Sequence, residues 1–146
     1  MGIIGKTLVS MATTLALMLS SPVWAGEEEL NEAIIDYMDF ATYESGIIVP
    51  EQMSKEVFES AYLVDTRDAE QFAEGTIPGA VNIDWREIPA RVDELPENRM
   101  VILFCNTGSL SAQAAFAARL MGHENVLILQ TGIIGWRENA DYKPET

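Results

Sequence analysis

Cys105 is the only cysteine in a chain of 146 residues, and its surroundings are those of a nucleophile. The apolar run 101–104, which is typical of a buried strand, ends directly before it. A polar turn follows and leads into an alanine-rich helix; the turn consists of Asn106, Thr107, Gly108, Ser109, Leu110 and Ser111. Turn amides and the positive end of a helix both stabilise a thiolate. The sequence therefore predicts that Cys105 is reactive.

A single cysteine also limits the chemistry of the chain. It excludes a disulfide within the chain, and together with the single histidine it excludes a cysteine–histidine zinc site. We expect no metal and no cofactor. The alternatives for Cys105 are a buried inert thiol, a disulfide between two chains and a reactive thiol, of which the polar turn favours the last. His123 follows Gly122 at the end of a predicted helix, where histidine commonly caps carbonyl groups or packs, and we prefer that interpretation to a catalytic role.

Residues 1–25 have the order of a secretory signal peptide. Lys6 precedes an apolar stretch at 8–19, and a small residue, Ala25, ends the segment. The stretch is short for a membrane-spanning helix, which needs roughly 20 residues, although an uncleaved anchor is the alternative. We expect cleavage after Ala25 and an exported, periplasmic protein with no stable membrane association after the signal is removed.

The remaining part, residues 26–146, has the size of one domain and is strongly acidic. It carries all 23 acidic residues and eight of the nine basic residues, a formal charge of −15 against −14 for the whole chain. Such a charge argues against nucleic acid and anionic membrane as partners. It also disfavours the long-range attraction of anionic substrates.

Strand and helix patterns alternate along this part. Strands are predicted at 47–49, 61–65, 80–83, 100–104 and 126–129, and helices at 54–58, 69–74, 85–92, 111–121 and 134–139. Alternation predicts an α/β fold with a mostly parallel central sheet of about five strands and helices on both faces. Ligands of such sheets bind at the carboxyl ends of the strands, where Asp65 and Cys105 are both expected.

An amphipathic helix is predicted over residues 27–43, before the sheet begins. Its apolar residues recur every three or four positions and are expected to pack on the domain; they are Leu30, Ala33, Ile34, Tyr37, Met38 and Ala41. The predicted organisation is a signal peptide at 1–25, an N-terminal helix at 26–45, one domain at 46–140 and a tail at 141–146.

Four stretches, in the right order, resemble the rhodanese domain family of single-domain sulfurtransferases. Residues 64–67 (Val-Asp-Thr-Arg) resemble the family's Asp-x-Arg, 75–83 its Gly-His-Ile-Pro-Gly-Ala segment, 101–112 its active-site strand and loop, and 129–136 its closing Leu-x-Gly-Gly-x-x-Gly-Trp. The resemblance implies a rhodanese-like fold. It also implies that Gly79, Gly132 and Gly135 stand at positions where the backbone conformation requires glycine and a side chain would clash.

The resemblance further implies a sulfurtransferase that forms a persulfide on Cys105. The loop 106–111 would bind the substrate and turn its amides toward the sulfur, stabilising a thiolate or a persulfide without a basic side chain. The donor would be thiosulfate or a related compound, and the acceptor cyanide, a small thiol or a protein thiol. Asp65 and Arg67 support the site in one of two ways. Either Arg67 pairs with a carboxylate such as Glu70 or Glu74 and fixes the turn, or it binds an anion beside Cys105.

The chain departs from the family pattern at three positions. Leu110 stands where a cation often meets thiosulfate, Thr76 replaces a histidine, and Thr131 replaces a glycine. We therefore expect a neutral or protein-bound sulfur species in place of thiosulfate. A phosphatase of this fold needs arginine six positions after the cysteine, where Ser111 stands, and is rejected. The alternatives kept open are a non-catalytic persulfide carrier and a domain with an inert cysteine.

Overall fold

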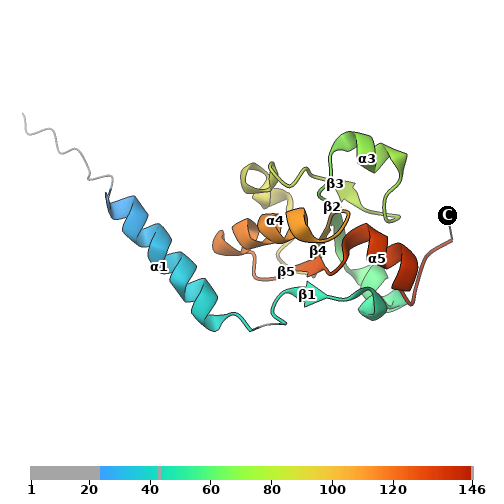
Figure 1. Ribbon diagram of the computed structural model, residues 1–146, viewed down its shortest axis with the longest axis horizontal. Coiled ribbons are helices and arrows are strands. Elements are labelled where there is room, and N and C mark those ends of the chain that lie inside the picture. The colour runs from blue at the N-terminus through green and yellow to red at the C-terminus, as the bar shows by residue number, and fades with distance from the viewer. Residues whose placement is uncertain (1–23, 43, 146) are drawn as a thin grey trace, which may run out of the picture.

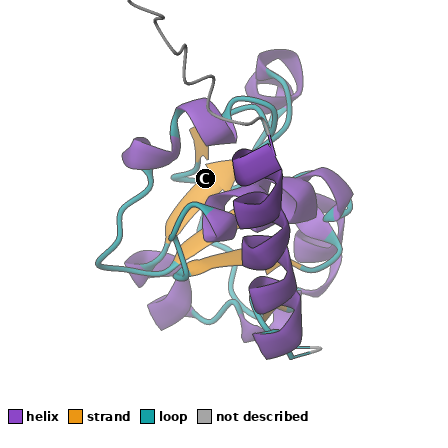
Figure 2. Ribbon diagram, turned by 90° about the vertical axis from the view of Figure 1, so that its left-hand side faces the viewer, coloured by secondary structure: helices purple, strands orange, loops and turns teal. Residues whose placement is uncertain are grey.

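The computed structural model describes residues 24–42 and 44–145, so the predicted signal peptide lies outside the described residues except for its last two. All strand pairs are parallel, in the order β1-β5-β4-β2-β3. The strands are β1 (Ile47–Ile48), β2 (Tyr62–Asp65), β3 (Val81–Asn82), β4 (Val101–Phe104) and β5 (Val126–Leu129). The predicted five-stranded α/β fold is confirmed, and Figure 2 shows the strands lying among the helices.

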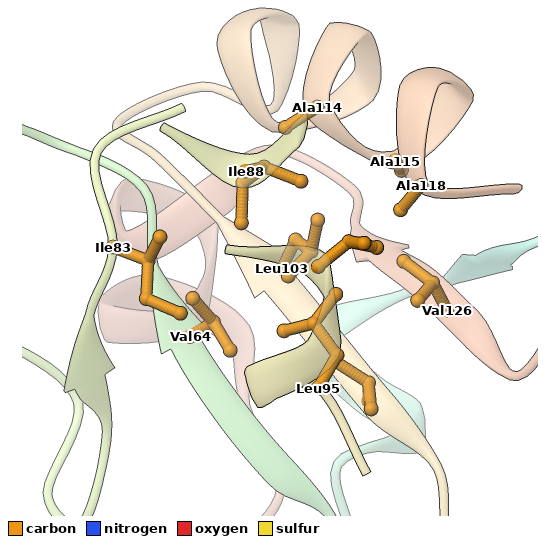
Figure 3. Packing of buried hydrophobic residues seen from close by; sticks show 11 residues of the cluster. Val64, Ile83, Ile88, Leu95, Leu103, Ala114, Ala115, Ala118 and Val126 are labelled. Carbon is orange, nitrogen blue, oxygen red and sulfur yellow. The ribbon is translucent and has the colours of Figure 1, made fainter. Parts of the chain in front are cut away.

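Both faces of the sheet are buried, and β4 shows why its sequence is apolar throughout. Val101 and Leu103 belong to one core cluster, while Ile102 and Phe104 belong to the other, because successive side chains of a strand point to opposite faces. The first cluster, drawn in Figure 3, packs the sheet against one face of α4 (Ser109–Leu120) and the segment 88–95. The second packs it against α2 (Lys55–Ser60) and α5 (Gly132–Asn139).

Short helices begin where side chains cap them. Ser54 accepts a hydrogen bond from the amide of Val57 at the start of α2, and Asp68 accepts one from Gln71 at the start of α3 (Ala69–Glu74). α4 and α5 each begin two residues earlier than predicted. The helix predicted at 85–92 is wrong: a turn at 85–87 is followed by two short 3₁₀ helices, Ile88–Ala90 and Val92–Glu94. Pro89 contributes to this difference because it lacks the amide that a longer helix needs.

The N-terminal helix α1 (Trp24–Phe40) extends away from the sheet and meets the domain through α4 (Figure 1). The Tyr37 ring packs edge-on against Phe116 with centroids 5.2 Å apart, and the Tyr37 hydroxyl accepts a hydrogen bond from Arg119 at 2.9 Å. The expected packing on the domain is confirmed at Tyr37, but the expected burial of the whole apolar stripe is wrong. Leu30 and Met38 are more than half exposed, because periodicity indicates an apolar face but not what covers it.

None of the helices within the described part of the chain combines the length and the apolar composition required to cross a bilayer.

Candidate active site at Cys105

Two strands deliver the predicted site residues to the same edge of the sheet. β2 and β4 are neighbours, and Asp65 at the end of β2 lies opposite Phe104 at the end of β4. The amide and hydroxyl of Thr66 both donate to the carbonyl of Phe104, at 2.8 and 3.0 Å, and fasten the strand ends together. The expectation that Asp65 and Cys105 share the carboxyl edge is therefore confirmed.

The loop after Cys105 turns its hydrogen-bond donors toward the sulfur. The amide of Gly108 lies 3.2 Å from Sγ, and the hydroxyl of Ser111 lies 3.7 Å from Sγ and 3.0 Å from the carbonyl of Gly108. Gly108 has φ +99°, a left-handed conformation that glycine adopts without a steric cost. It is also the N-cap of α4, so the sulfur lies at the positive end of a twelve-residue helix.

The other side of the loop is held by the first turn of α5. The carbonyls of Cys105 and Asn106 accept hydrogen bonds from the amides of Ile133 and Ile134, at 2.8 and 3.2 Å. A trans peptide points its carbonyl and its amide in opposite directions. Binding the Asn106 carbonyl to α5 therefore turns the Thr107 amide away from α5, toward the side on which the sulfur lies. The sulfur cradle depends on this second helix as well as on α4.

Burial and hydrogen bonding act against each other on the Cys105 thiol. The residue is only 2% exposed, and burial raises its pKa. The amides of Ser111, Thr107 and Gly108 and the Ser111 hydroxyl lower the pKa, and together they outweigh burial. The pKa of Cys105 therefore lies below that of an ordinary thiol, and backbone groups supply most of the effect.

Arg67 pairs with Asp65 at the end of its own strand. Its Nε lies 2.9 Å from Oδ1 of Asp65, its Nη2 bonds the other carboxylate oxygen, and Nη2 also donates to the carbonyl of Gly75 at 2.8 Å. Arg67 does pair with a nearby carboxylate, but the partner is Asp65 and not Glu70 or Glu74, because the side chain folds back onto the buried carboxylate two residues away. The hydrogen bonds that Arg67 donates to Asp65 raise the pKa of Arg67 against the effect of burial.

Asn106 joins this ion pair to the cysteine loop. Its Oδ1 accepts a hydrogen bond from Nη1 of Arg67 at 3.4 Å, and its Nδ2 donates to Oε1 of Gln71 at 2.7 Å. The Thr76 hydroxyl donates to Asp65 at 2.8 Å. Sequence reasoning missed Gln71, for which no motif exists, and it treated Thr76 only as a departure from the family pattern. The charge of Arg67 is thus largely neutralised by Asp65 beside the site.

The exposed part of the loop is neutral. Thr107, Ser109 and Leu110 are exposed, and the segment 106–111 contains no charged residue. Within the described part of the chain, the donors that act on the sulfur come from this loop: the amides of Thr107, Gly108 and Ser111 and the hydroxyl of Ser111. His123 lies elsewhere, buried between α4 and β5, where its amide donates to the carbonyl of Ala118.

This chain is similar in sequence to a sulfurtransferase and to a putative sulfur carrier protein, and in fold to a solved sulfurtransferase. The chain is 38% identical over 82 residues to a sulfurtransferase of Allochromatium vinosum, a match that covers 56% of this chain and 77% of that protein. It is 32% identical over 78 residues to the putative sulfur carrier protein YrkF of Bacillus subtilis, covering 53% of this chain but only 42% of that protein. The solved structure of the human single-domain sulfurtransferase TSTD1 matches with a TM-score of 0.59 at 25% identity, covering 66% of this chain and 98% of that one.

A family model described as the rhodanese-like domain matches residues 49–139, which form more than half of the chain and include the whole Cys105 loop. The chain belongs to the rhodanese-like domain family.

Proposed function

We propose that this protein is a sulfurtransferase that carries a sulfane sulfur on Cys105. The Cys105 thiolate attacks the outer sulfur of a donor such as thiosulfate, a bond forms between the two sulfurs, and sulfite leaves with the electron pair of the broken bond. A thiophilic acceptor, cyanide or a thiol, then attacks the terminal sulfur of the persulfide. Breaking the new bond returns the electron pair to Cys105 as a thiolate, so no base and no redox partner are needed.

The observation that carries the proposal is the position of Sγ, 3.2 Å from the Gly108 amide at the start of α4. Fixed amide dipoles stabilise an anion without being consumed, and they suit a persulfide anion as well as a thiolate. The phosphatase alternative fails at Ser111, which stands six positions after Cys105 and has no charge with which to bind a phosphate group.

We expect the preferred donor to be neutral or to be carried by a protein thiol. Leu110 is 37% exposed where the family often places a cation, and the nearby Arg67 is occupied by Asp65. A sulfonate anion therefore finds no free positive side chain in the loop, although loop amides remain to bind it. Thiosulfate serves in this proposal as a weak substitute for the natural donor.

A second candidate function is a persulfide carrier that loads sulfur once and releases it only to a partner protein. It is favoured by the neutral loop, and by the likeness to YrkF, whose name describes a putative sulfur carrier. Steady-state turnover with thiosulfate and cyanide separates the two candidates. A transferase forms thiocyanate over many cycles, whereas a carrier stops after one equivalent of sulfur for each protein.

The experiment that tests sulfur loading is the intact mass of the full chain after incubation with thiosulfate. We expect the mass of one added sulfur atom on the parent protein and no addition on Cys105→Ser, which keeps the size of the side chain. Ser109→Ala is the matched control, since Ser109 is exposed in the same loop and bonds only Thr107. Addition of sulfur to Cys105→Ser at the parent level contradicts the proposal.

We also propose that the protein is exported to the periplasm after cleavage behind Ala25. The apolar stretch at 8–19 and the small residue at 25 support this location. The protein recovered from a periplasmic extract should begin at Gly26, which N-terminal sequencing measures directly. A chain that keeps residues 1–25 and sediments with membranes contradicts it.

A further inference from the structure

The α1 helix carries a wide apolar face that the rest of the described chain leaves mostly uncovered. Only Ile34 and Tyr37 are half-buried, while Phe40 is 85% exposed. The opposite face is acidic. Residues 24–42 contain six carboxylates and no lysine or arginine; the carboxylates are Glu27, Glu28, Glu29, Glu32, Asp36 and Asp39. An amphipathic helix with an open apolar face marks a surface that another molecule covers.

A groove of about 560 Å³ lies where α1 meets the end of α4. Tyr37 and Phe40 from α1 and Leu120 from α4 supply its apolar walls, and Arg119 lies among them. Each guanidinium nitrogen of Arg119 already donates a hydrogen bond, to the Tyr37 hydroxyl and to two backbone carbonyls. Arg119 therefore holds the groove together and is poorly placed to bind an anion.

Two carboxylates, Asp36 and Glu124, complete the lining of the groove. Both side chains are exposed, and neither takes part in an ion pair or hydrogen bond within the described residues. An apolar groove bordered by unpaired carboxylates favours a ligand with an apolar centre and positive flanks. A second copy of this chain, with the same acidic helix and a formal charge of −14, brings like charges together, and an anionic membrane does the same.

We propose that the α1–α4 groove binds a segment of a partner protein in which apolar side chains are flanked by lysine or arginine. The groove lies at the amino edge of the sheet, because Arg119 bonds the carbonyls of Gly46 and Val126, at the starts of β1 and β5. Cys105 lies at the opposite, carboxyl edge. The partner therefore holds the protein in place while the cysteine loop stays open to its sulfur donor and acceptor.

The test uses the full chain and two synthetic peptides with the same leucine and phenylalanine centre, flanked by lysines in one and by glutamates in the other. Fluorescence anisotropy measures binding of each peptide at low and high salt. We expect the lysine peptide to bind more tightly and to lose affinity with salt, since screening weakens exposed charge pairs. Equal binding of the two peptides overturns the proposal.

Variants on the two walls locate the binding site. Phe40→Ser on α1 and Leu120→Ser on α4 should each weaken binding of the lysine peptide by about tenfold, the loss typical of an anchoring side chain. Asp36→Lys should do the same through charge. The matched controls are Ile35→Ser and Asp39→Lys, on the same helix but outside the groove. Equal losses in the controls show unspecific attraction to an acidic helix and overturn the proposal.

The same variants also test two other possible occupants of the α1–α4 groove. A concentration-dependent dimer in light scattering that Phe40→Ser abolishes assigns the groove to a second copy of this chain, and overturns the basic partner. Binding to vesicles of phosphatidylcholine and phosphatidylglycerol that Phe40→Ser abolishes assigns it to a membrane, with the same consequence. Sulfur loading of Cys105 should be unchanged in all these variants, which separates a failure here from a failure of the sulfurtransferase proposal.

Discussion

At the scale of single residues, the site is an anion-stabilising cradle built around one sulfur atom. Cys105 is almost fully buried, yet its pKa is lowered because amides and one hydroxyl face it. Removing one donor should therefore be visible as a change in acidity. Ser111 is the donor that a mutation can remove, because it acts on the sulfur through its side-chain hydroxyl as well as through its backbone amide.

Alkylation of Cys105 by iodoacetamide should increase with pH to a midpoint below the value of 9.0 for an ordinary thiol. Only the thiolate reacts, so a lowered pKa moves the rise to lower pH. Ser111→Ala should move the midpoint upward by removing one donor. Ser109→Ala, in the same loop, should leave it unchanged. A parent midpoint at or above 9.0 would show that burial prevails over the amides.

Leu110→Arg should lower the KM for thiosulfate several-fold, because it adds a free cation to a loop that has none. The gain should shrink as salt is raised, which distinguishes charge attraction from a change in loop shape. Met121→Arg is the matched control, an exposed residue at the far end of α4 with the same change in charge. An unchanged KM in Leu110→Arg would mean that this side chain does not face the substrate.

At the scale of elements, α5 serves the site without contributing a side chain to the sulfur. Its first turn binds the carbonyls of Cys105 and Asn106, and this approach requires Gly132. A Cβ at Gly132 would collide with the Cys105 carbonyl, and its φ of +59° is strained for other residues. Thr131, directly before it, has the same left-handed conformation at φ +63° although it is not glycine.

Two neighbouring substitutions should therefore change stability in opposite directions. Gly132→Ala should lower the free energy of unfolding by about 2 kcal/mol or more, through left-handed strain and the clash with the loop. Thr131→Gly should raise it by about 1 kcal/mol, because glycine adopts positive φ without strain. Urea denaturation measures both. A stable Gly132→Ala with an unchanged Cys105 titration would contradict the role given to α5.

The sequence predicted elements well where local and tertiary preferences agree. The strand at 126–129 has the predicted bounds, and Asp65 and Cys105 lie at the expected edge of the sheet. A continuous apolar run is enough to predict a buried strand of a parallel sheet, without knowledge of the strands beside it. The helix at 85–92 was predicted from its pattern alone, and the structure contains 3₁₀ turns there. The contacts of Gln71 with Asn106 and of Thr76 with Asp65 join segments far apart in the chain, which no local pattern reveals.

At the scale of the whole molecule, the two edges of the sheet have separate environments. The carboxyl edge holds the neutral cysteine loop, and the amino edge holds the α1–α4 groove with its unpaired carboxylates. α4 connects them, with its first turn beside Cys105 and its last turn beside α1. The chain as a whole carries a formal net charge of −14. Long-range electrostatics should therefore act on any anion that approaches Cys105, even though the loop itself is uncharged.

Iodoacetate should alkylate Cys105 more slowly than neutral iodoacetamide does. The ratio of the two alkylation rates should be larger for Cys105 than for a free thiol such as cysteine. The negative field of the protein repels the anionic reagent, so the difference should narrow as salt is raised. The alkylation rates are measured with both reagents at the same pH, so that each reagent serves as the control for the other. A ratio that does not respond to salt would show that the field at the loop is set by nearby dipoles alone.

The near-complete enclosure of the Cys105 sulfur has a consequence for selectivity by size. A persulfide lengthens the side chain by an S–S bond of about 2.05 Å, so the transferable atom projects beyond the atom that bonds to the protein. Small nucleophiles reach that outer atom first, whereas a bulky disulfide such as oxidised glutathione has little room to approach the inner one. If Cys105 carries sulfur as proposed, its burial would hinder mixed-disulfide formation at the inner sulfur and leave the outer sulfur within reach of small acceptors.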